Sequence, residues 1–256
     1  MTVLDLMGGL ATGLVSGFTS GLLGVSPGGG LVVFAVLLLG AEQHMAQGLS
    51  LIAQIPPTSA AGIRRYWDGG SRVAVSMLVW LGLGFLLGGV IGALIANRVA
   101  AAVLQWAYVI YLLLLAALML CRSSVRQAEA AAVDPRGGAL LAVGCAAGVS
   151  SGFLGIGGGL ATVVGLSAVL GMAQHRAQMI SLVLTLVPAT IPSAWIYWQH
   201  GVLPAWSTLV AVIIGLAVGT DLGARLASRV APARLRVLLV CFVLLMAFYM
   251  TLKAIR

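Results

Sequence analysis

Charged residues are scarce in this chain: aspartate, glutamate, lysine and arginine together make up 8% of its 256 residues. Soluble domains carry about 25% charged residues, so this composition excludes an ordinary soluble domain. Cysteine is scarce as well, and Cys121, Cys145 and Cys241 lie within or at the ends of apolar runs. They lack the spacing of metal ligands, so we interpret them as small core residues and expect no metal site and no cofactor.

Apolar residues dominate the chain and make up 61% of it. A helix needs about 20 such residues to cross the apolar core of a bilayer, which is about 30 Å thick. Runs near this length occupy residues 4–23, 73–96, 99–121, 137–154, 203–221 and 235–252. The net charge of +8 comes from basic residues scattered singly between these runs, so no nucleic-acid partner is expected. The composition predicts an all-α polytopic membrane protein surrounded by the lipid bilayer.

The two halves of the chain repeat one pattern. Gly17–Gly28 aligns with Gly148–Gly159, and further along His44 aligns with His175. The residue numbers in every such pair differ by the same amount, which we call the repeat offset. The register holds without a gap from about residue 10 to residue 104. A duplicated unit in so apolar a chain predicts a membrane transporter built from repeats.

Each repeat contains about five apolar segments. In the first transmembrane repeat, residues 1–121, they lie at 4–24, 31–40, 45–67, 72–97 and 100–121; in the second, residues 137–256, they lie at 137–155, 160–171, 176–199, 203–226 and 232–253. The polar stretch 122–136 joins the two as a linker. The second segment of each repeat is too short to span the bilayer, because nine helical residues cover about 14 Å. We expect it to be a half-helix that returns the chain to its starting side. Three spanning helices follow, so each repeat crosses the membrane an odd number of times. The second repeat then starts on the opposite side from the first, and the two repeats are inverted.

The basic residues predict which side faces the cytoplasm. With the linker inside, 11 of the 14 lysines and arginines also fall inside. They are Arg64, Arg65, Arg72, Arg122, Arg126, Arg136, Arg176, Arg225, Arg229, Arg234 and Arg236. The positive-inside rule therefore favours a cytoplasmic linker and places both termini outside.

Glycine-rich turns open the two short segments, at Gly24–Gly30 and Gly155–Gly159. Glycine allows the backbone to approach a ligand closely, and the unpaired N–H groups at a helix N-terminus suit an anion. The alternative is that these glycines only allow close helix packing. Because the turns recur at one register, we predict a shared anion site. Its backbone part would be Ser26, Gly28, Gly29, Gly30, Gly157, Gly158 and Gly159.

Polar residues recur on one face of each third segment. Gln47, Ser50 and Gln54 have helical spacing in the first half, and Gln178, Ser181 and Thr185 repeat it in the second. Thr58, Ser59 and Thr190 lie nearby. Such side chains can bond neighbouring helices, but the matched pattern leads us to predict that they line the substrate. The prolines Pro56, Pro57, Pro188 and Pro192 are expected to break or kink these helices.

Two motifs carry a family resemblance. Residues 152–159, Gly-Phe-Leu-Gly-Ile-Gly-Gly-Gly, and their counterpart at 21–30 resemble the signature of the TauE/SafE sulfite-exporter-like permeases. The stretches that begin at His44 and His175 resemble the second signature of that family. Ser26 and Pro27 replace two glycines of its first turn. The resemblance covers essentially the whole chain and implies a permease of the bacterial inner membrane that moves sulfite, an organosulfonate or a related small anion.

Few residues are candidates for proton coupling. His44 and His175 begin the third segments, where a histidine commonly caps a helix or lies at the interface but can also relay protons. Asp221 is expected to be the best-buried acid, although Arg225 lies four residues later and an ion pair is the simpler interpretation. We interpret the remaining interfacial residues as membrane anchors: Arg64, Arg65, Tyr66, Trp67, Tyr197 and Trp198.

Together these features predict a secondary transporter that works by alternating access, with one repeat rocking against the other. No Gly-Lys-Ser/Thr triplet follows either turn, so the energy is expected to come from a proton or other ion gradient, or from the gradient of the substrate itself. A passive anion channel with the same site is the alternative that the sequence leaves open. An intramembrane enzyme is a weaker alternative, because no pair of nucleophile and base is visible. The oligomeric state and the direction of transport stay open.

Overall fold

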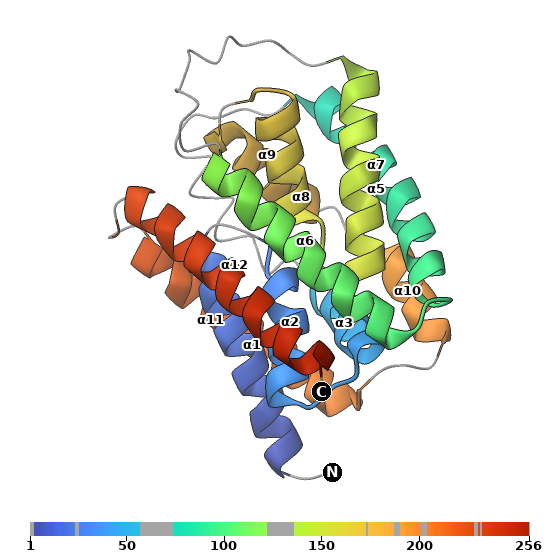
Figure 1. Cartoon of the computed structure of the whole chain (residues 1–256), viewed down its shortest axis with the longest axis vertical. Helices are drawn as coiled ribbons and strands as arrows, with labels where there is room; N and C mark the ends of the chain where they lie inside the picture. Colours follow the sequence, from blue (N-terminus) through green and yellow to red (C-terminus); the bar gives the residue numbers. More distant parts are fainter. Residues whose placement is uncertain are drawn as a thin grey trace.

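A computed structural model describes residues 3–23, 26–56, 74–121, 136–172, 174–186, 190–200, 204–227, 230 and 232–255. The described chain is helical throughout (Figure 1). Its helices are α1 (Val3–Leu23), α2 (Gly28–Leu38), α3 (Gln43–Ala53), α5 (Val75–Ala96), α6 (Ala101–Cys121), α7 (Gly137–Leu154), α8 (Gly159–Val164), α9 (Gln174–Leu186), α10 (Ile191–Gln199), α11 (Trp206–Ala227) and α12 (Pro232–Ile255). A π-helical turn, η1 (Gly165–Val169), extends α8.

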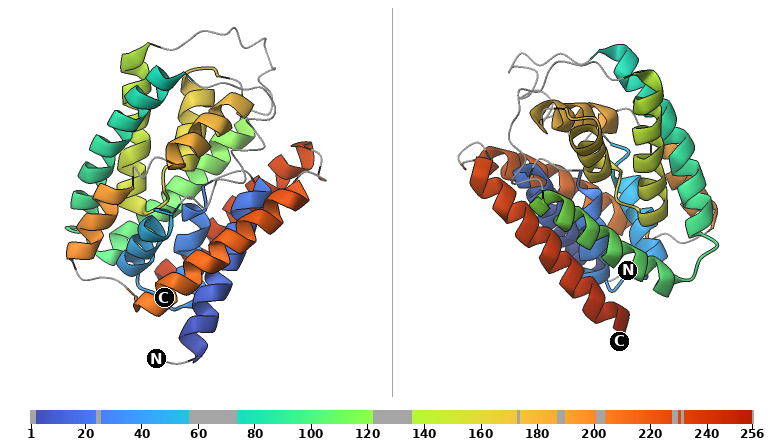
Figure 2. Two further views of the ribbon diagram at one scale, coloured as in Figure 1. Left: turned by 180° about the vertical axis from the view of Figure 1, so that it is seen from behind. Right: turned by 45° about the horizontal axis from the view of Figure 1, so that its top comes forward.

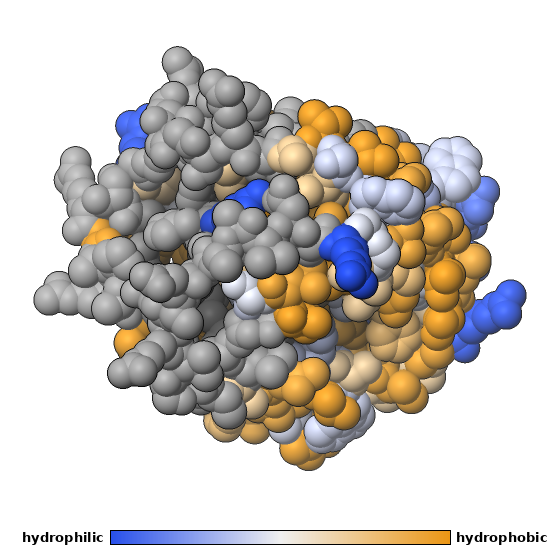
Figure 3. Space-filling view, turned by 90° about the horizontal axis from the view of Figure 1, so that it is seen from above, coloured by the Kyte–Doolittle hydropathy of each residue, from blue (hydrophilic) through white to orange (hydrophobic). Residues whose placement is uncertain are grey.

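Four of the described helices are long and apolar enough to cross a membrane: α1, α5, α7 and α11. Large apolar side chains such as Leu87, Ile110 and Phe248 point outward from the bundle. Apolar residues also cover much of the described surface in the space-filling view (Figure 3). Exposing such an apolar surface to water costs free energy, whereas exposing it to the apolar core of a bilayer does not. The prediction of an all-α multi-pass membrane protein is therefore confirmed.

Two helix pairs form the tightest packing in the bundle. α1 lies along α11, and α5 lies along α7, on opposite sides of the molecule (Figures 1 and 2). Both pairs meet through glycines spaced four residues apart. A Cβ atom at Gly17 would overlap the carbonyl oxygen of Leu216, and one at Gly219 would overlap the carbonyl oxygen of Leu14. Glycine at these positions lets the two backbones touch, as small residues do in membrane bundles.

The second pair reproduces these contacts at the repeat offset. A Cβ atom at Gly148 would overlap the carbonyl oxygen of Phe85, and one at Gly88 would overlap that of Cys145. Each pair therefore takes one helix from the first half of the chain and one from the second. The halves are interlocked, because α1 packs on a helix of the other half and α7 does the same in return.

The remaining long helices join the two pairs. α6 packs against α12, and both cross the front of the bundle in Figure 1. Both ends of the chain lie at the bottom of that view, whereas α7 begins at the top. The core fills the space between these helices with residues such as Leu31, Leu49, Tyr108 and Leu216.

The second and third segments of each half are short. α2 has 11 residues and α8 has 6, as the sequence predicts for half-helices. The apolar segments at 45–67 and 176–199 are interrupted, as their prolines predict: α3 ends at Ala53, and α9 and α10 are separate helices. Pro192 lies in the first turn of α10, where proline is well tolerated. Residues 57–73 and 187–189, with Pro57, Thr58, Ser59, Arg64, Arg65, Tyr66, Trp67 and Pro188, lie outside the described residues.

We expect alanine at Gly148 to destabilise the protein by about 1–3 kcal/mol, because its Cβ atom would push apart the backbones of α7 and α5. The matched control is Gly138→Ala on the same helix, where a Cβ atom would meet nothing within 4 Å. That change should be neutral or stabilising. Thermal unfolding of both variants in detergent measures the difference, and equal midpoints would contradict the interlocked packing.

Candidate functional site

The two glycine-rich turns meet in the interior of the bundle. The turn between α1 and α2 lies directly on the turn between α7 and α8. A Cβ atom at Gly28 would overlap the carbonyl group of Ile156, and one at Gly159 would overlap the side chain of Ser26. Gly157 and Gly158 have φ values of 73° and 68°, a backbone conformation that favours glycine. Both the close approach and the backbone shape therefore require glycine here.

A chain of hydrogen bonds ties the polar face of α3 to both turns. The Ser26 hydroxyl donates to Gln54 Oε1 at 2.7 Å, and Gln54 Nε2 donates to the Ser50 carbonyl oxygen at 2.8 Å. The Ser50 hydroxyl in turn donates to the carbonyl oxygen of Gly155, in the second turn, at 2.7 Å. All three side chains are buried. The predicted site residues of the first half are thus brought together, and in this conformation they bond to one another and to the turns.

The two matched serines make matched bonds. The Ser50 hydroxyl lies 3.3 Å from the carbonyl oxygen of Gly28, and the Ser181 hydroxyl donates to the carbonyl oxygen of Gly159 at 3.1 Å. The carbonyl groups of these glycines belong to the first turns of α2 and α8. Ser181 therefore bonds to the start of the half-helix in its own half, whereas the single hydrogen of Ser50 can serve only one of Gly28 and Gly155 at a time, and Gly155 is the nearer.

Tyr197 joins α10 to this network. Its fully buried hydroxyl lies 2.9 Å from Gln47 Oε1 and 3.0 Å from the carbonyl oxygen of Gly152. The hydroxyl carries one hydrogen, so it can satisfy only one of these acceptors at a time. Gln47 Nε2 is buried and has no hydrogen-bond partner among the described residues. The expectation that Tyr197 is an interfacial anchor is wrong, because the side chain lies inside the bundle; Trp198 is partly exposed.

The start of α2 presents free backbone donors. The first bond within this helix runs from the Leu31 amide to the Pro27 carbonyl oxygen, so the N–H groups of Gly28, Gly29 and Gly30 have no partner within it. No described side chain caps the helix at Pro27. Aligned peptide dipoles give such an end a partial positive charge of about half a unit. This end of α2 therefore attracts an anion without any lysine or arginine.

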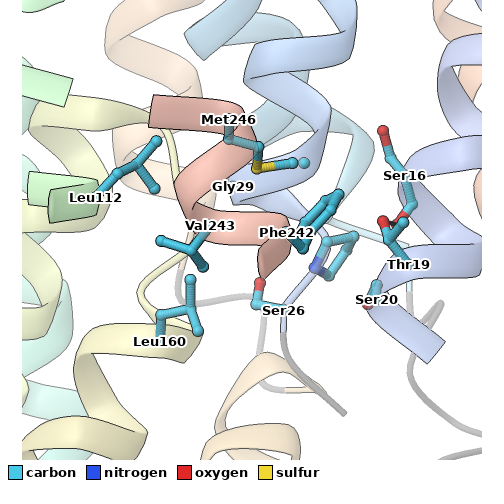
Figure 4. Close-up of a pocket in the computed structure, with 12 residues that line it drawn as sticks. Ser16, Thr19, Ser20, Ser26, Gly29, Leu112, Leu160, Phe242, Val243 and Met246 are labelled. Carbon is cyan, nitrogen blue, oxygen red and sulfur yellow. Dashed lines mark hydrogen bonds between the residues drawn. The ribbon is translucent and has the colours of Figure 1, made fainter. Parts of the chain in front are cut away.

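A small cavity borders this end of α2 (Figure 4). Its polar wall includes Ser16, Thr19 and Ser20 on α1 and Ser26 in the turn. Its apolar wall includes Phe242, Val243 and Met246 on α12, with Leu112 and Leu160 from α6 and α8. Its volume is about 10 Å³, which is about the space that one water molecule needs.

Two candidates for proton coupling, Asp221 and His44, contact groups outside the glycine-rich turns. Asp221 was expected to be the best-buried acid, but its side chain is 46% exposed and lies 2.7 Å from Arg225, so it forms a surface ion pair within α11. His44 is partly buried, with Nε2 3.1 Å from the carbonyl oxygen of Ala96. The side chains of His175, Gln178 and Thr185 lie outside the described part of the structure. Within the described part, no three histidine, cysteine or acidic side chains cluster to hold a metal ion.

Sequence reasoning missed several residues of this region. The buried Tyr108 hydroxyl donates to the Gly29 carbonyl oxygen at 2.6 Å, but its counterpart in the second half is Leu239, so no repeated pattern marks it. The tyrosine–tryptophan pair at 197–198 does recur at 66–67, and that repetition was the available signal for Tyr197. The hydroxyls of α1 that line the cavity had no signal beyond their helical spacing.

We expect Tyr197→Phe to destabilise the protein by about 1–3 kcal/mol, because it removes the one donor that serves either Gln47 Oε1 or the carbonyl oxygen of Gly152. Tyr249→Phe is a suitable control, because Tyr249 is a partly buried tyrosine of α12, on a different helix from this network. Thermal unfolding of the two purified variants would show the difference. A Tyr197→Phe protein as stable as the control would argue against the role given to the hydroxyl.

Comparison with known proteins agrees with the two signature motifs. The profile of the family described as Sulfite exporter TauE/SafE matches residues 9–250 of the chain. No curated protein matches the sequence. The profile spans both glycine-rich turns, both interlocked helix pairs and the cavity between α1, α2 and α12. The chain therefore belongs to the sulfite exporter TauE/SafE family, a family of membrane transporters.

Proposed function

We propose that this protein is a secondary transporter of a small anion, most favourably sulfite or an organosulfonate, across the bacterial inner membrane. The observation that carries the proposal is the meeting of the two glycine-rich turns, one from each half, beside the uncapped start of α2. Half-helix ends that meet inside a membrane bundle form the substrate site of many repeat-built transporters. Family membership supports the sulfur oxyanions as the substrate class.

The chemistry of the site fits an oxyanion. Backbone N–H groups at a helix start and neutral hydroxyls donate hydrogen bonds to oxygen atoms carrying negative charge. The ion pair of Asp221 and Arg225 is half exposed on α11 and would not compete for the anion inside the bundle. An anion held by neutral donors also leaves the site more easily than one paired with a buried arginine, as transport requires.

The same proposal includes two inverted repeats, at residues 1–121 and 137–256, joined by a cytoplasmic linker at 122–136 with both termini in the periplasm. The recurrence of the glycine contacts at the repeat offset supports the two repeats, and the excess of basic residues on the side of the linker supports the orientation. The moving bodies would not be the two sequence repeats, because the backbones of α1 and α11 would have to separate. We infer that alternating access moves the α1–α11 pair against the α5–α7 pair.

Transport by purified protein in liposomes tests the function. We expect saturable uptake of radiolabelled sulfite, and faster uptake when unlabelled sulfite is loaded inside, because a carrier exchanges its substrate across the membrane. An imposed pH gradient that changes the rate would indicate proton coupling, for which His44, His175 and Asp221 are the candidates. Uptake that rises linearly with concentration and gives no counterflow would instead establish a channel, and no flux of any sulfur oxyanion would refute the proposal.

Alanine at Gln47, Ser50, Gln178 or Ser181 should weaken sulfite binding about tenfold, because each change removes a polar group from the predicted site or frees a turn that the side chain fixes. Isothermal titration of the purified variants measures the affinity. Each variant is first checked by thermal unfolding, and Ser50→Thr, which retains a hydroxyl, serves as the conservative control. Unchanged affinity in folded alanine variants would show that the anion binds elsewhere.

A further inference from the structure

Ser16 on α1 has a buried polar group that nothing nearby satisfies. Its side chain is 0% exposed, and its hydroxyl has no hydrogen-bond partner among the residues that the structure describes. Buried hydroxyls are nearly always paired, because leaving one unpaired is costly. Thr12, one turn earlier, is in the same state. Of these two hydroxyls, only that of Ser16 belongs to a residue that lines the cavity, so Ser16 is the one placed to meet a polar ligand there.

The unpaired Ser16 hydroxyl and the free end of α2 face the same space. Ser16 lines the cavity, and so do Gly29 and Gly30, whose N–H groups belong to the uncapped first turn of α2 (Figure 4). α2 has 11 residues, enough for its peptide dipoles to add up along the axis. The hydroxyl and the two amides are hydrogen-bond donors without a partner inside their helices. An oxyanion can accept from all of them, and the partial positive charge at the start of α2 favours an anion over a neutral acceptor.

The facing wall sets the size of the anion. Met246 on α12 reaches across the cavity, and its Cε atom lies 3.6 Å from the place where a Cβ atom of Gly30 would be. Phe242 and Val243 complete this wall. A cavity of about 10 Å³ admits an oxyanion only when a wall side chain turns aside, and methionine is the most flexible of the three. The apolar wall also suits a small apolar substituent on the anion.

The second half of the chain reproduces only part of this polar wall. At the repeat offset, Ser16 corresponds to Ala147 and Ser26 to Gly157. Thr12 corresponds to Val143 in the same way. α8 has only 6 residues before the π-helical turn begins. Ser16 and Ser26 are therefore particular to the first half, whereas Thr19 and Ser20 have hydroxyl counterparts in Ser150 and Ser151.

We propose that the cavity between α1, α2 and α12 is the anion-binding position of the transporter, with Ser16 and the first turn of α2 as donors and Met246 as the residue that limits anion size. This rests on the proposed function, because it takes the transported anion as the ligand. The site is asymmetric: the first half holds the anion, and the second half supplies the turn that packs against it.

The test uses the full-length purified protein and three probes: sulfite, methanesulfonate and propanesulfonate. Ser16→Ala should weaken binding of each anion about tenfold, because a hydrogen bond to a charged oxygen is lost. Without ligand, the same variant should unfold at the wild-type temperature or above it, because it removes an unpaired buried hydroxyl. A merely structural serine would give the opposite pattern, with lower stability and unchanged affinity.

Ser151→Ala is the matched control. Ser151 lies on α7, is 1% exposed and has a hydroxyl without a described partner, but it does not line this cavity. We expect wild-type affinity in this variant. If Ser16→Ala and Ser151→Ala bind the anions equally well, the asymmetric site is wrong while the proposed function stands. If the wild-type protein binds and transports none of the three anions, both proposals fail.

Met246 supplies an independent readout. Met246→Ala enlarges the cavity, so the affinity for propanesulfonate should rise by about fivefold or more relative to the affinity for methanesulfonate. Met246→Leu, a side chain of similar volume, should keep the wild-type ratio of the two affinities. The ratio of two affinities in one variant is insensitive to a general loss of stability. An unchanged ratio in Met246→Ala would overturn the assignment of Met246.

Discussion

The structure depends on close backbone contacts at glycine residues, which occur between α1 and α11 and again between α5 and α7. Lipid tails are as apolar as leucine side chains, so helices in a bilayer gain little from burying apolar surface against each other. Close van der Waals contact between backbones replaces that driving force. Because Gly17 meets Leu216 and Gly148 meets Phe85, the two contacts fix α1 and α7, and these helices end where the glycine-rich turns begin.

The turns are then held by polar groups that point inward from the short helices. Ser50 and Ser181 anchor the first turns of α2 and α8, while Gln54 connects Ser26 to Ser50 across the centre. A membrane interior has no water to satisfy such groups, so each must find a partner within the protein or in a ligand. Most of the central groups find one in the protein. The Ser16 hydroxyl and Gln47 Nε2 have no partner among the described residues, so their bonding capacity is left for a ligand.

The duplication made much of this architecture predictable from the sequence. It identified the half-helices, the recurring glycines and the matched serines, because each position could be checked against its counterpart. It did not reveal that α1 pairs with α11, because small residues show that a face packs closely but not which helix it meets. The sequence predicts Tyr197 at the membrane interface, but its side chain lies inside the bundle. The break between α9 and α10 changes which face of the following helix points inward, so the helical spacing within α9 does not predict the side on which Tyr197 lies. The cavity was missed because Met246 and Phe242 lie on the last helix of the chain, whereas Ser16 lies on the first.

The interlocking of the halves also constrains how the protein is made. α1 comes before the other described helices in the chain, yet its glycine face fits α11, which begins at Trp206. During synthesis the glycine face of α1, with Thr12 and Ser16 on the same helix, has no α11 to pack against until the chain has been translated through α11. α7, by contrast, finds α5 already in place when it emerges. The α5–α7 pair can therefore form before the α1–α11 pair, which can be completed only after α11 has been translated.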